Sequence, residues 1–295
     1  MMEPEIHQFG EHDLQNVLVW MPPQQRAAEY LFWIVLIHGG AWRDPMITAR
    51  TFADPVVSKL LSNPAADLKI PGNKTVAIAS LSYRLSPHPS YPQDPDASPR
   101  NAIHPDHLDD VCTGIDVLRR VYGLSSNNYV LVGHSCGATL AFQAWKRHID
   151  TGFPLAPGAL VGLAGIYDIK ALLRNHSTGP FADIYESFIR GAFGDDEKVW
   201  VEASPSRFAL HGMDFPRTIL LAVADRDELV EPEQRTIMKG TLLGNETLES
   251  MKSDIGNGNV RYSEVSVPGG HDEMWEKGEN MVLVVDRLLN VLSEV

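Results

Sequence analysis

The feature that most constrains the fold of this chain is a serine between two glycines at residues 133–137, GHSCG. An apolar, β-branched run at 129–132 precedes it, and a run typical of a helix follows at 138–145. A strand, a sharp turn and a helix in this order predict a turn that holds the serine in a strained backbone conformation, with its hydroxyl above the sheet edge. Gly133 and Gly137 are small because the strand and the helix crowd each other there.

The rest of the chain alternates between strand-like and helix-like segments. Runs that predict strands lie at 32–37, 76–81, 129–132, 159–163, 218–223 and 260–267. Segments that predict helices lie at 49–61, 105–122, 138–149, 232–243 and 273–292. Continuous apolar strands are typical of burial on both faces, so we expect an α/β fold with a mostly parallel, doubly wound sheet flanked by helices. The run at 16–20 is expected to add an antiparallel edge strand, and 260–267 to lie near the other edge.

Length and spacing predict a single domain that spans residues 1–295. Apolar residues make up 44% of the chain, enough for one sizeable core. The segment 168–215 is too long for one simple crossover, and we expect two or three short helices there, forming a cap over the C-terminal edge of the sheet. The proline-rich segment 86–105 predicts a long loop, and long ordered loops are often functional.

Charge and cysteine content limit the partners of this chain. The net charge is −13 and no cluster of lysine and arginine occurs, which argues against nucleic-acid binding. No apolar run approaches the roughly 20 residues of a membrane-spanning helix. The N-terminal residues lack the features of a secretory signal, and the two cysteines do not suggest a disulfide scaffold. We therefore expect a cytoplasmic protein with a small-molecule substrate and neither a membrane nor a nucleic-acid partner.

A serine nucleophile requires a base, and the base requires an orienting carboxylate. In α/β-hydrolases the order along the chain is serine, acid, histidine. Ser135 is followed by Asp225 and Asp227, both in the loop after the 218–223 strand. Asp227 is preferred because Asp-x-x-Val at that loop is the usual placement of the acid, and Asp225 stays the alternative. His271 lies on a glycine-rich loop before the last helix and is the predicted base.

An oxyanion hole is predicted at the HGGAW run, residues 38–42, which follows the first central strand. A glycine pair in such a turn lets backbone N–H groups point at one spot. We expect an N–H group from Gly39, Gly40 or Ala41, together with that of Cys136, to hold the tetrahedral oxygen.

Three aromatic residues are candidates for the substrate pocket: Trp42, Tyr83 and Tyr167. Each also has a structural interpretation, since Trp42 fits plain packing, Tyr83 fits a buried pair with Arg84, and Tyr167 fits a turn of the chain. His38 and His134 are expected to brace their loops.

No metal site is predicted, although several side chains at one helix start resemble a cluster of ligands, because acidic residues there also serve the helix dipole. These residues are His104, Asp106, His107, Asp109 and Asp110.

The two glycine-rich motifs resemble those of the HisGlyGly branch of the α/β-hydrolases, the hormone-sensitive-lipase-like esterases. Within that branch, residues 38–42 are similar to the HisGlyGly-x-Trp motif of kynurenine formamidases. Residues 82–88 (SYRLSPH) and 133–138 (GHSCGA) resemble the fungal form of that enzyme. The resemblance implies Ser135 as nucleophile, Asp227 as acid and His271 as base, with oxyanion donors at Gly40 and Ala41. The stretch 244–258 departs from shorter members, and we expect it to lengthen a surface loop.

The resemblance also implies an activity, the hydrolysis of N-formyl-L-kynurenine to L-kynurenine and formate, with no metal or organic cofactor. Related enzymes are often dimers, which implies a homodimer. One alternative is a broad-specificity carboxylesterase for short acyl esters with the same machinery. The other is a non-catalytic receptor for a small ligand, which is disfavoured because such proteins usually lose the serine or the histidine.

Overall fold

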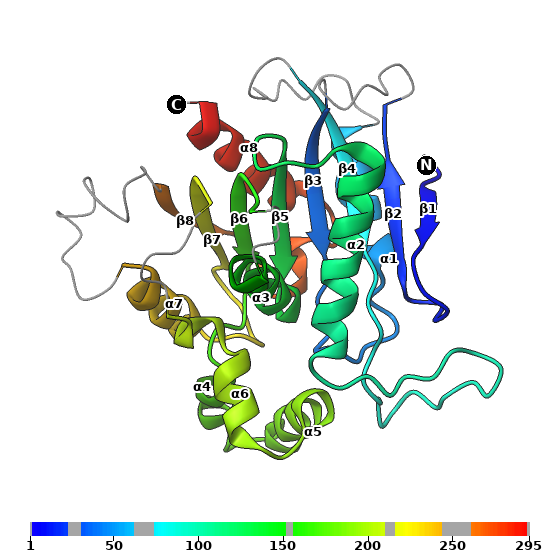
Figure 1. Ribbon diagram of the computed structural model, residues 1–295. Coiled ribbons are helices and arrows are strands. Elements are labelled where there is room, and N and C mark those ends of the chain that lie inside the picture. Colours follow the sequence, from blue (N-terminus) through cyan, green and yellow to red (C-terminus); the bar gives the residue numbers. More distant parts are fainter. Residues whose placement is uncertain are drawn as a thin grey trace.

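The computed structural model describes residues 2–22, 31–61, 74–151, 156–209, 216–243 and 261–293. Its centre is an eight-stranded sheet in the order β1-β2-β4-β3-β5-β6-β7-β8 (Figure 1). The strands from β4 to β8 in this order run parallel, whereas β2 is antiparallel to both β1 and β4. The prediction of a mostly parallel sheet is therefore confirmed.

All strands except β1 agree closely with the runs predicted from the sequence. The strands are β1 (Glu5–Gln8), β2 (Asn16–Trp20), β3 (Leu31–Ile37), β4 (Thr75–Leu81), β5 (Tyr129–His134), β6 (Ala159–Leu163), β7 (Thr218–Ala224) and β8 (Arg261–Val267). β8 forms one edge, as its alternating pattern predicted. The run at 16–20 is not the other edge, because the short strand β1 pairs outside it.

Alternation along the central strands supplies two separate cores. In β3, Trp33 and Val35 belong to the core on one face of the sheet, and Ile34 and Leu36 belong to the core on the other. Successive side chains of a strand point to opposite faces, so an unbroken apolar run is what a strand covered on both sides requires.

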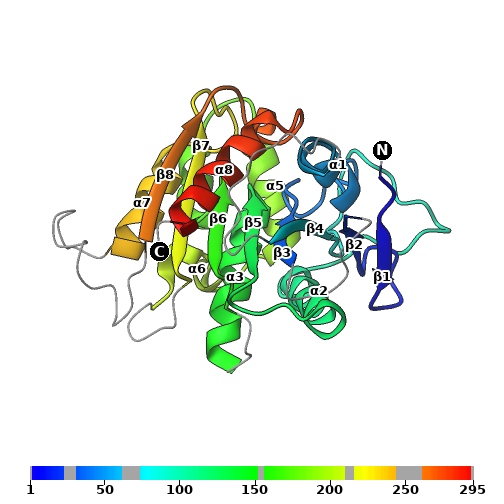
Figure 2. The same cartoon turned by 90° about the horizontal axis from the view of Figure 1, so that it is seen from above.

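Helices cover both faces of the sheet. They are α1 (Ala49–Leu60), α2 (Asp106–Tyr122), α3 (Cys136–Thr151), α4 (Ile169–Asn175), α5 (Ala182–Phe193), α6 (Glu197–Ala203), α7 (Glu233–Leu243) and α8 (Glu279–Ser293), with short 3-10 turns η3 (Pro205–Arg207) and η5 (Asp272–Met274). Figure 2 shows α1 and α8 on one face and α2 and α3 on the other. The predicted helix 273–292 is wrong at its start, because Gly278 has φ of 78° and separates η5 from α8.

Three helices and one turn, α4, α5, α6 and η3, lie between β6 and β7 in the chain, within the segment predicted as a cap. They lie beyond the C-terminal ends of the central strands in Figure 1; residues 210–215 fall outside the described part. Asp168 begins α4 by accepting a hydrogen bond from the Ala171 N–H at 2.9 Å. Trp42 packs edge-on against Phe193 of α5, with ring centroids 4.9 Å apart, and so joins this insertion to the sheet edge.

The segment 86–105 forms a long irregular connection from β4 to α2, as expected. Ser86 fixes the start of this connection: its N–H donates to the Trp42 carbonyl at 2.9 Å, and its hydroxyl donates to the carbonyl of Ala102, near the end of the same segment, at 2.8 Å. The stretch 244–258, predicted to be a surface loop, lies outside the described residues. None of the described helices combines the length and apolar character that a bilayer span demands.

Candidate active site

Ser135 stands at a sharp turn between β5 and α3, with a left-handed φ of 53°. Residues other than glycine rarely adopt this backbone conformation, because it costs on the order of 1 kcal/mol or more. The flanking glycines allow the close approach, because a Cβ on Gly133 would lie 2.2 Å from the Gly137 carbonyl oxygen, and one on Gly137 would lie 2.3 Å from the Ile37 carbonyl oxygen. The strained turn predicted from the sequence is confirmed.

His271 is paired with Asp227. The imidazole Nδ1 lies 2.9 and 3.0 Å from the two carboxylate oxygens, and both side chains are about 95% buried, with 4% and 5% exposed. The N–H groups of Leu229 and Val230 also donate to Asp227, at 3.0 and 2.8 Å. These bonds hold the carboxylate in place, so that it fixes both the orientation and the tautomer of the imidazole.

The alternative acid, Asp225, contacts the backbone of the loop that carries His271. Its carboxylate accepts the N–H of Gly269 at 2.8 Å, in the loop that carries His271. Glu228 accepts the backbone N–H of His271 at 3.1 Å. Asp225 and Glu228 therefore hold the backbone of the loop that carries His271, whereas Asp227 contacts the imidazole ring of His271.

His134 braces the same loop from the other side. Its Nε2 lies 3.1 Å from the His271 carbonyl oxygen, and its ring lies 4.6 Å from that of His271. Burial, reinforced by the neighbouring His271, holds the pKa of His134 well below its usual range. The ring is thus neutral, with the proton on Nε2 donated to the carbonyl. This matches the structural role expected for His134.

The segment after β3 has an unusual backbone. Gly40, Ala41 and Trp42 have φ of 96°, 49° and 59°, three left-handed residues in succession. The carbonyl of Gly40 accepts the N–H groups of Arg43 and Asp44, at 2.9 and 2.8 Å. A Cβ on Gly39 would lie 3.1 Å from the Cβ of Ser135, so this segment passes directly beside the serine. Such turned backbone can direct N–H groups at a developing negative charge.

The side chains of Tyr83 and Cys136 support this turn. The Tyr83 hydroxyl donates to the carbonyls of His38 and Gly39, at 3.0 and 3.1 Å, and its ring stacks on His38. The thiol of Cys136 accepts the Trp42 N–H at 3.3 Å. Burial lowers the pKa of His38 to about 4 and raises that of Cys136 to about 11, so both are neutral near pH 7.

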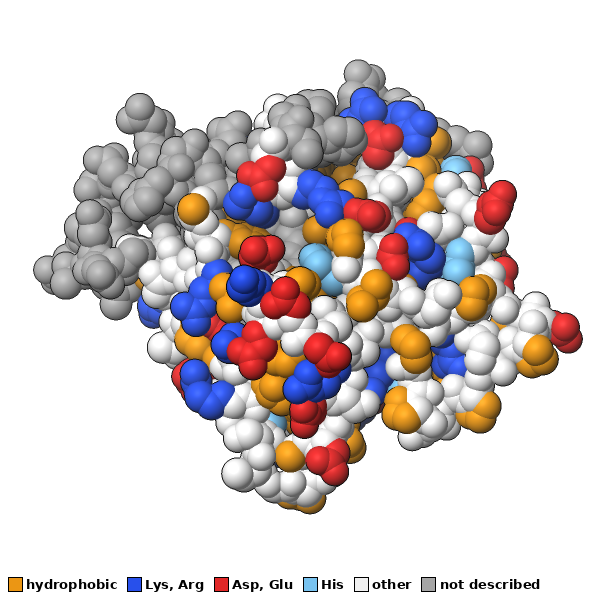
Figure 3. Space-filling view, turned by 60° about the horizontal axis from the view of Figure 1, so that its bottom comes forward, with side chains coloured by type: hydrophobic (Ala, Val, Ile, Leu, Met, Phe, Trp, Pro, Cys, Tyr) orange, Lys and Arg blue, Asp and Glu red, His pale blue; other side chains and the backbone are white. Residues whose placement is uncertain are grey.

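Ser135, His271, Gly40 and Ala41 all line one cavity of about 350 Å³. Its opposite wall comes from the inserted helices and includes Ile184, Tyr185 and Phe188. Three side chains of the lining are exposed and form what we call the apolar rim: Phe181, Ile184 and Leu229. Figure 3 looks toward this side of the molecule, where hydrophobic side chains are interspersed with both acidic and basic ones.

The three aromatic residues predicted for the pocket lie elsewhere. Among the described residues that line the cavity, Trp42, Tyr83 and Tyr167 are absent. Trp42 is buried against α5, and Tyr83 supports the turn. Tyr167 is fully buried below the end of β6, and its backbone N–H donates to the side chain of Gln234.

Residues that the sequence analysis did not single out take their place: Arg43, Asp44 and His88. Arg43 and Asp44 directly follow the HGGAW motif, and that adjacency was the available signal.

The acidic cluster at the start of α2 is used by ion pairs. Asp110 accepts from three nitrogens of Arg84, at 2.8 to 3.0 Å, and Asp109 is paired with Arg147. Within the described chain, the residues that could share an ion are His134, His271 and Asp272, with ligand atoms within 4.8 Å of one another. The Nδ1 of His271 contacts Asp227 and the Nε2 of His134 contacts the His271 carbonyl oxygen, and these contacts orient the two rings.

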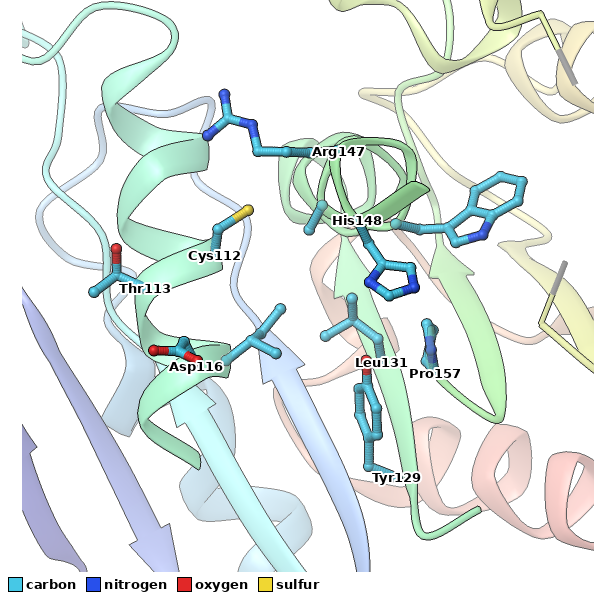
Figure 4. A pocket seen from close by; sticks show the side chains of 11 residues that line it. Cys112, Thr113, Asp116, Tyr129, Leu131, Arg147, His148 and Pro157 are labelled. Carbon is cyan, nitrogen blue, oxygen red and sulfur yellow. The ribbon is translucent and has the colours of Figure 1, made fainter. Parts of the chain in front are cut away.

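A second cavity, of about 280 Å³, lies between α2 and α3 (Figure 4). Cys112, Tyr129 and His148 contribute to its lining. Tyr129 is the first residue of β5, so this α2–α3 cavity adjoins the end of the strand opposite to Ser135. Burial raises the pKa of the Cys112 thiol to about 11, which leaves the thiol protonated and weakly nucleophilic.

The chain is similar to several fungal proteins over most of its length. A kynurenine formamidase-like hydrolase from Fusarium equiseti is 35% identical over 293 residues, covering 95% of this chain and 91% of the relative. A kynurenine formamidase from Aspergillus versicolor is 33% identical, covering 85% and 86%. A kynurenine formamidase from Meyerozyma guilliermondii is 32% identical, covering 81% and 80%. The chain matches no protein-family model.

Several solved structures that share this fold are esterases. Esterase B from Lactobacillus rhamnosis superposes with a TM-score of 0.66 at 16% identity, covering 99% of this chain and 88% of that one. Carboxyl esterase 2 from Tuber melanosporum gives 0.66 at 17% identity, covering 99% and 86%. At these identities the likeness shows the fold alone, and it confirms the α/β-hydrolase fold.

Proposed function

The chain belongs to the kynurenine formamidase family, and on that premise we propose that it hydrolyses N-formyl-L-kynurenine to L-kynurenine and formate. The observation that carries the proposal is that His271, which is paired with Asp227, lines the same cavity as the strained Ser135. These are the parts that acyl transfer through a serine requires.

The first half of the reaction forms a formyl-enzyme. The hydroxyl oxygen of Ser135 attacks the formyl carbon while the Nε2 of His271 takes the hydroxyl proton. Asp227 stabilises the imidazolium that results. Backbone N–H groups near Gly40, Ala41 and Cys136 hold the tetrahedral oxyanion, and loss of one such donor typically costs about 3 kcal/mol of transition-state stabilisation.

The second half regenerates the enzyme. The carbon–nitrogen bond breaks, and His271 gives its proton to the leaving aryl amine, which departs as L-kynurenine. A water molecule, deprotonated by the same imidazole, then attacks the formyl ester. Formate leaves, and Ser135 recovers its proton. A formyl group is the smallest acyl group, so it fits the confined space beside the turn at Gly40, while the apolar wall of α5 is available for the aryl ring.

Turnover of N-formyl-L-kynurenine beside p-nitrophenyl acetate tests the assignment. We expect purified protein to cleave the formamide with the higher kcat/KM, and the variant Ser135→Ala to cleave neither. Ready cleavage of the ester with the formamide left intact would instead establish a general carboxylesterase of the same fold. Failure of a fluorophosphonate probe to label Ser135 would favour a receptor.

Location and assembly are also proposals. Cys112 and Cys136 are both free thiols, which supports a reducing compartment such as the cytosol. The homodimer expected from the family resemblance stays a prediction, which sedimentation of the purified protein would test.

A further inference from the structure

Arg43, in the wall of the catalytic cavity, is a buried charged side chain that forms no salt bridge within the described residues. Arg43 is only 6% exposed and lines the cavity. Within the described residues, its guanidinium makes one hydrogen bond, from Nη1 to the Ser187 hydroxyl at 2.9 Å, and lies over the Phe188 ring at 5.7 Å. No salt bridge of Arg43 occurs among those residues. Burial accordingly lowers its pKa, with Asp44 as the opposing influence.

Buried charges in proteins are normally paired, because taking an ion out of water is costly. A guanidinium has five donors in a planar fork that matches a carboxylate. Among the described residues, the Ser187 hydroxyl accepts from only one of the five donors of Arg43. A buried arginine with spare donors in the wall of a catalytic cavity is therefore suited to an anionic group of the substrate.

The neighbouring residue carries the complementary charge. Asp44 also lines the cavity, and one of its carboxylate oxygens accepts the Met46 N–H at 2.8 Å. The backbone N–H groups of Arg43 and Asp44 both donate to the Gly40 carbonyl. The same turn thus positions a cation and an anion side by side, a few residues from the backbone proposed to hold the oxyanion.

We propose that Arg43 and Asp44 form a subsite for the amino-acid end of the substrate, with Arg43 binding the carboxylate and Asp44 the ammonium group. This rests on the proposed function, since that end is what distinguishes N-formyl-L-kynurenine from a simple aryl formamide. The cavity, at about 350 Å³, has room for the whole molecule. The subsite would select a formamide that carries a free α-amino acid over neutral formamides and esters.

The test compares two substrates that share the reacting end. N-formyl-L-kynurenine carries the amino acid, whereas 2-formamidoacetophenone keeps the aryl ketone and the formamide without it. In the variant Arg43→Gln, the ratio of kcat/KM for the first substrate to that for the second should fall by about 10- to 100-fold, mainly through KM, which is the loss typical of a charge-assisted hydrogen bond. Arg43→Lys should recover part of the ratio.

A matched control separates binding from support of α5. Ser187→Ala removes the hydrogen bond of Arg43 to that helix and keeps the charge, so the ratio should stay within about twofold of the wild type. Two outcomes would overturn the proposal while leaving the formamidase function intact. One is an equal fall in kcat/KM for both substrates in Arg43→Gln, and the other is a fall in the ratio in Ser187→Ala as large as that in Arg43→Gln.

A binding measurement keeps the inference testable apart from turnover. Calorimetry with Ser135→Ala should show that L-kynurenine binds more tightly than 2-aminoacetophenone, and that Arg43→Gln in the same background removes the preference. Equal affinities for the two amines would overturn the subsite. An inactive wild type that still prefers L-kynurenine would contradict the proposed function and support the subsite.

Discussion

The cavity at the C-terminal end of β5 and the α2–α3 cavity at its other end differ little in volume, about 350 against 280 Å³, but they differ greatly in the backbone around them. The first is lined by Gly40, Ala41 and Ser135, all with left-handed φ, and by the paired His271. Among the described residues that line the second, none has a positive φ.

The difference shows that volume is a poor guide to chemistry in this molecule. Strained backbone persists only where the surrounding structure determines it, and it gathers at catalytic sites. Around the first cavity, the strained backbone is held by Tyr83, His134 and Asp225, each of which supports a loop through hydrogen bonds. The α2–α3 cavity offers a protonated thiol and an apolar wall, which suit packing or passive occupancy.

Loss of the proposed nucleophile, Ser135, should have the largest effect on turnover. Ser135→Ala removes the attacking oxygen, and turnover should fall by on the order of 10⁵- to 10⁶-fold, as in other serine hydrolases. Thermal unfolding should change little, because alanine occupies the same strained φ at the same cost. A variant that fails to fold would show that the hydroxyl supports the structure.

Replacement of the proposed catalytic acid, Asp227, should have the next largest effect. Asp227→Asn should reduce kcat by about 10⁴-fold, because an amide favours the wrong tautomer of His271. Asp225→Asn is the matched control, since Asp225 touches the Gly269 N–H and not the imidazole. Its effect should be much smaller, and greater damage from Asp225→Asn than from Asp227→Asn would refute the assignment of the acid.

Two buried histidines, His38 and His107, should make the folded protein less stable in acid. Burial lowers the pKa of His38 to about 4 and that of His107 to about 3, whereas both groups regain about 6.5 on unfolding. Below pH 6.5 the unfolded chain binds more protons than the folded one, so the free energy of unfolding falls by about 1.4 kcal/mol per pH unit for each histidine until its folded pKa is reached. Denaturant titrations at pH 7 and pH 5 measure the loss, and equal stabilities at these two values would contradict it.

A substitution in the α2–α3 cavity should have the smallest effect on turnover. Cys112→Ala alters its lining and touches nothing in the proposed mechanism, so turnover should stay within about twofold of the wild type. Thiol reagents at pH 8 should react slowly with the folded protein, since the pKa of Cys112 and that of Cys136 are both about 11. A tenfold loss of activity in Cys112→Ala would mean that the two cavities are coupled.

Most of the fold and the pairing of His271 with Asp227 could be predicted because local patterns encode them. Unbroken apolar runs identified the parallel strands, and two glycine-rich motifs identified the turns. The chain order of acid and histidine then located the remaining partners.

The lining of the cavity could not be predicted, because it depends on which side chains of distant segments turn inward. Tyr83 and Tyr167 are aromatic residues beside the site, but their rings serve the loop and the core. The wall comes instead from α5, whose position depends on the packing of Phe193 on Trp42. No local pattern reports such a long-range contact.

The apolar rim matters for anyone who wishes to redirect this hydrolase. Phe181 and Ile184 are 58% and 50% exposed, so replacing them disturbs little packing, whereas a methyl group added at Gly133 would collide with the main chain. A mutagenesis library is best concentrated on the mouth of the cavity, where new acyl or leaving groups can be admitted while the reactive machinery keeps its shape.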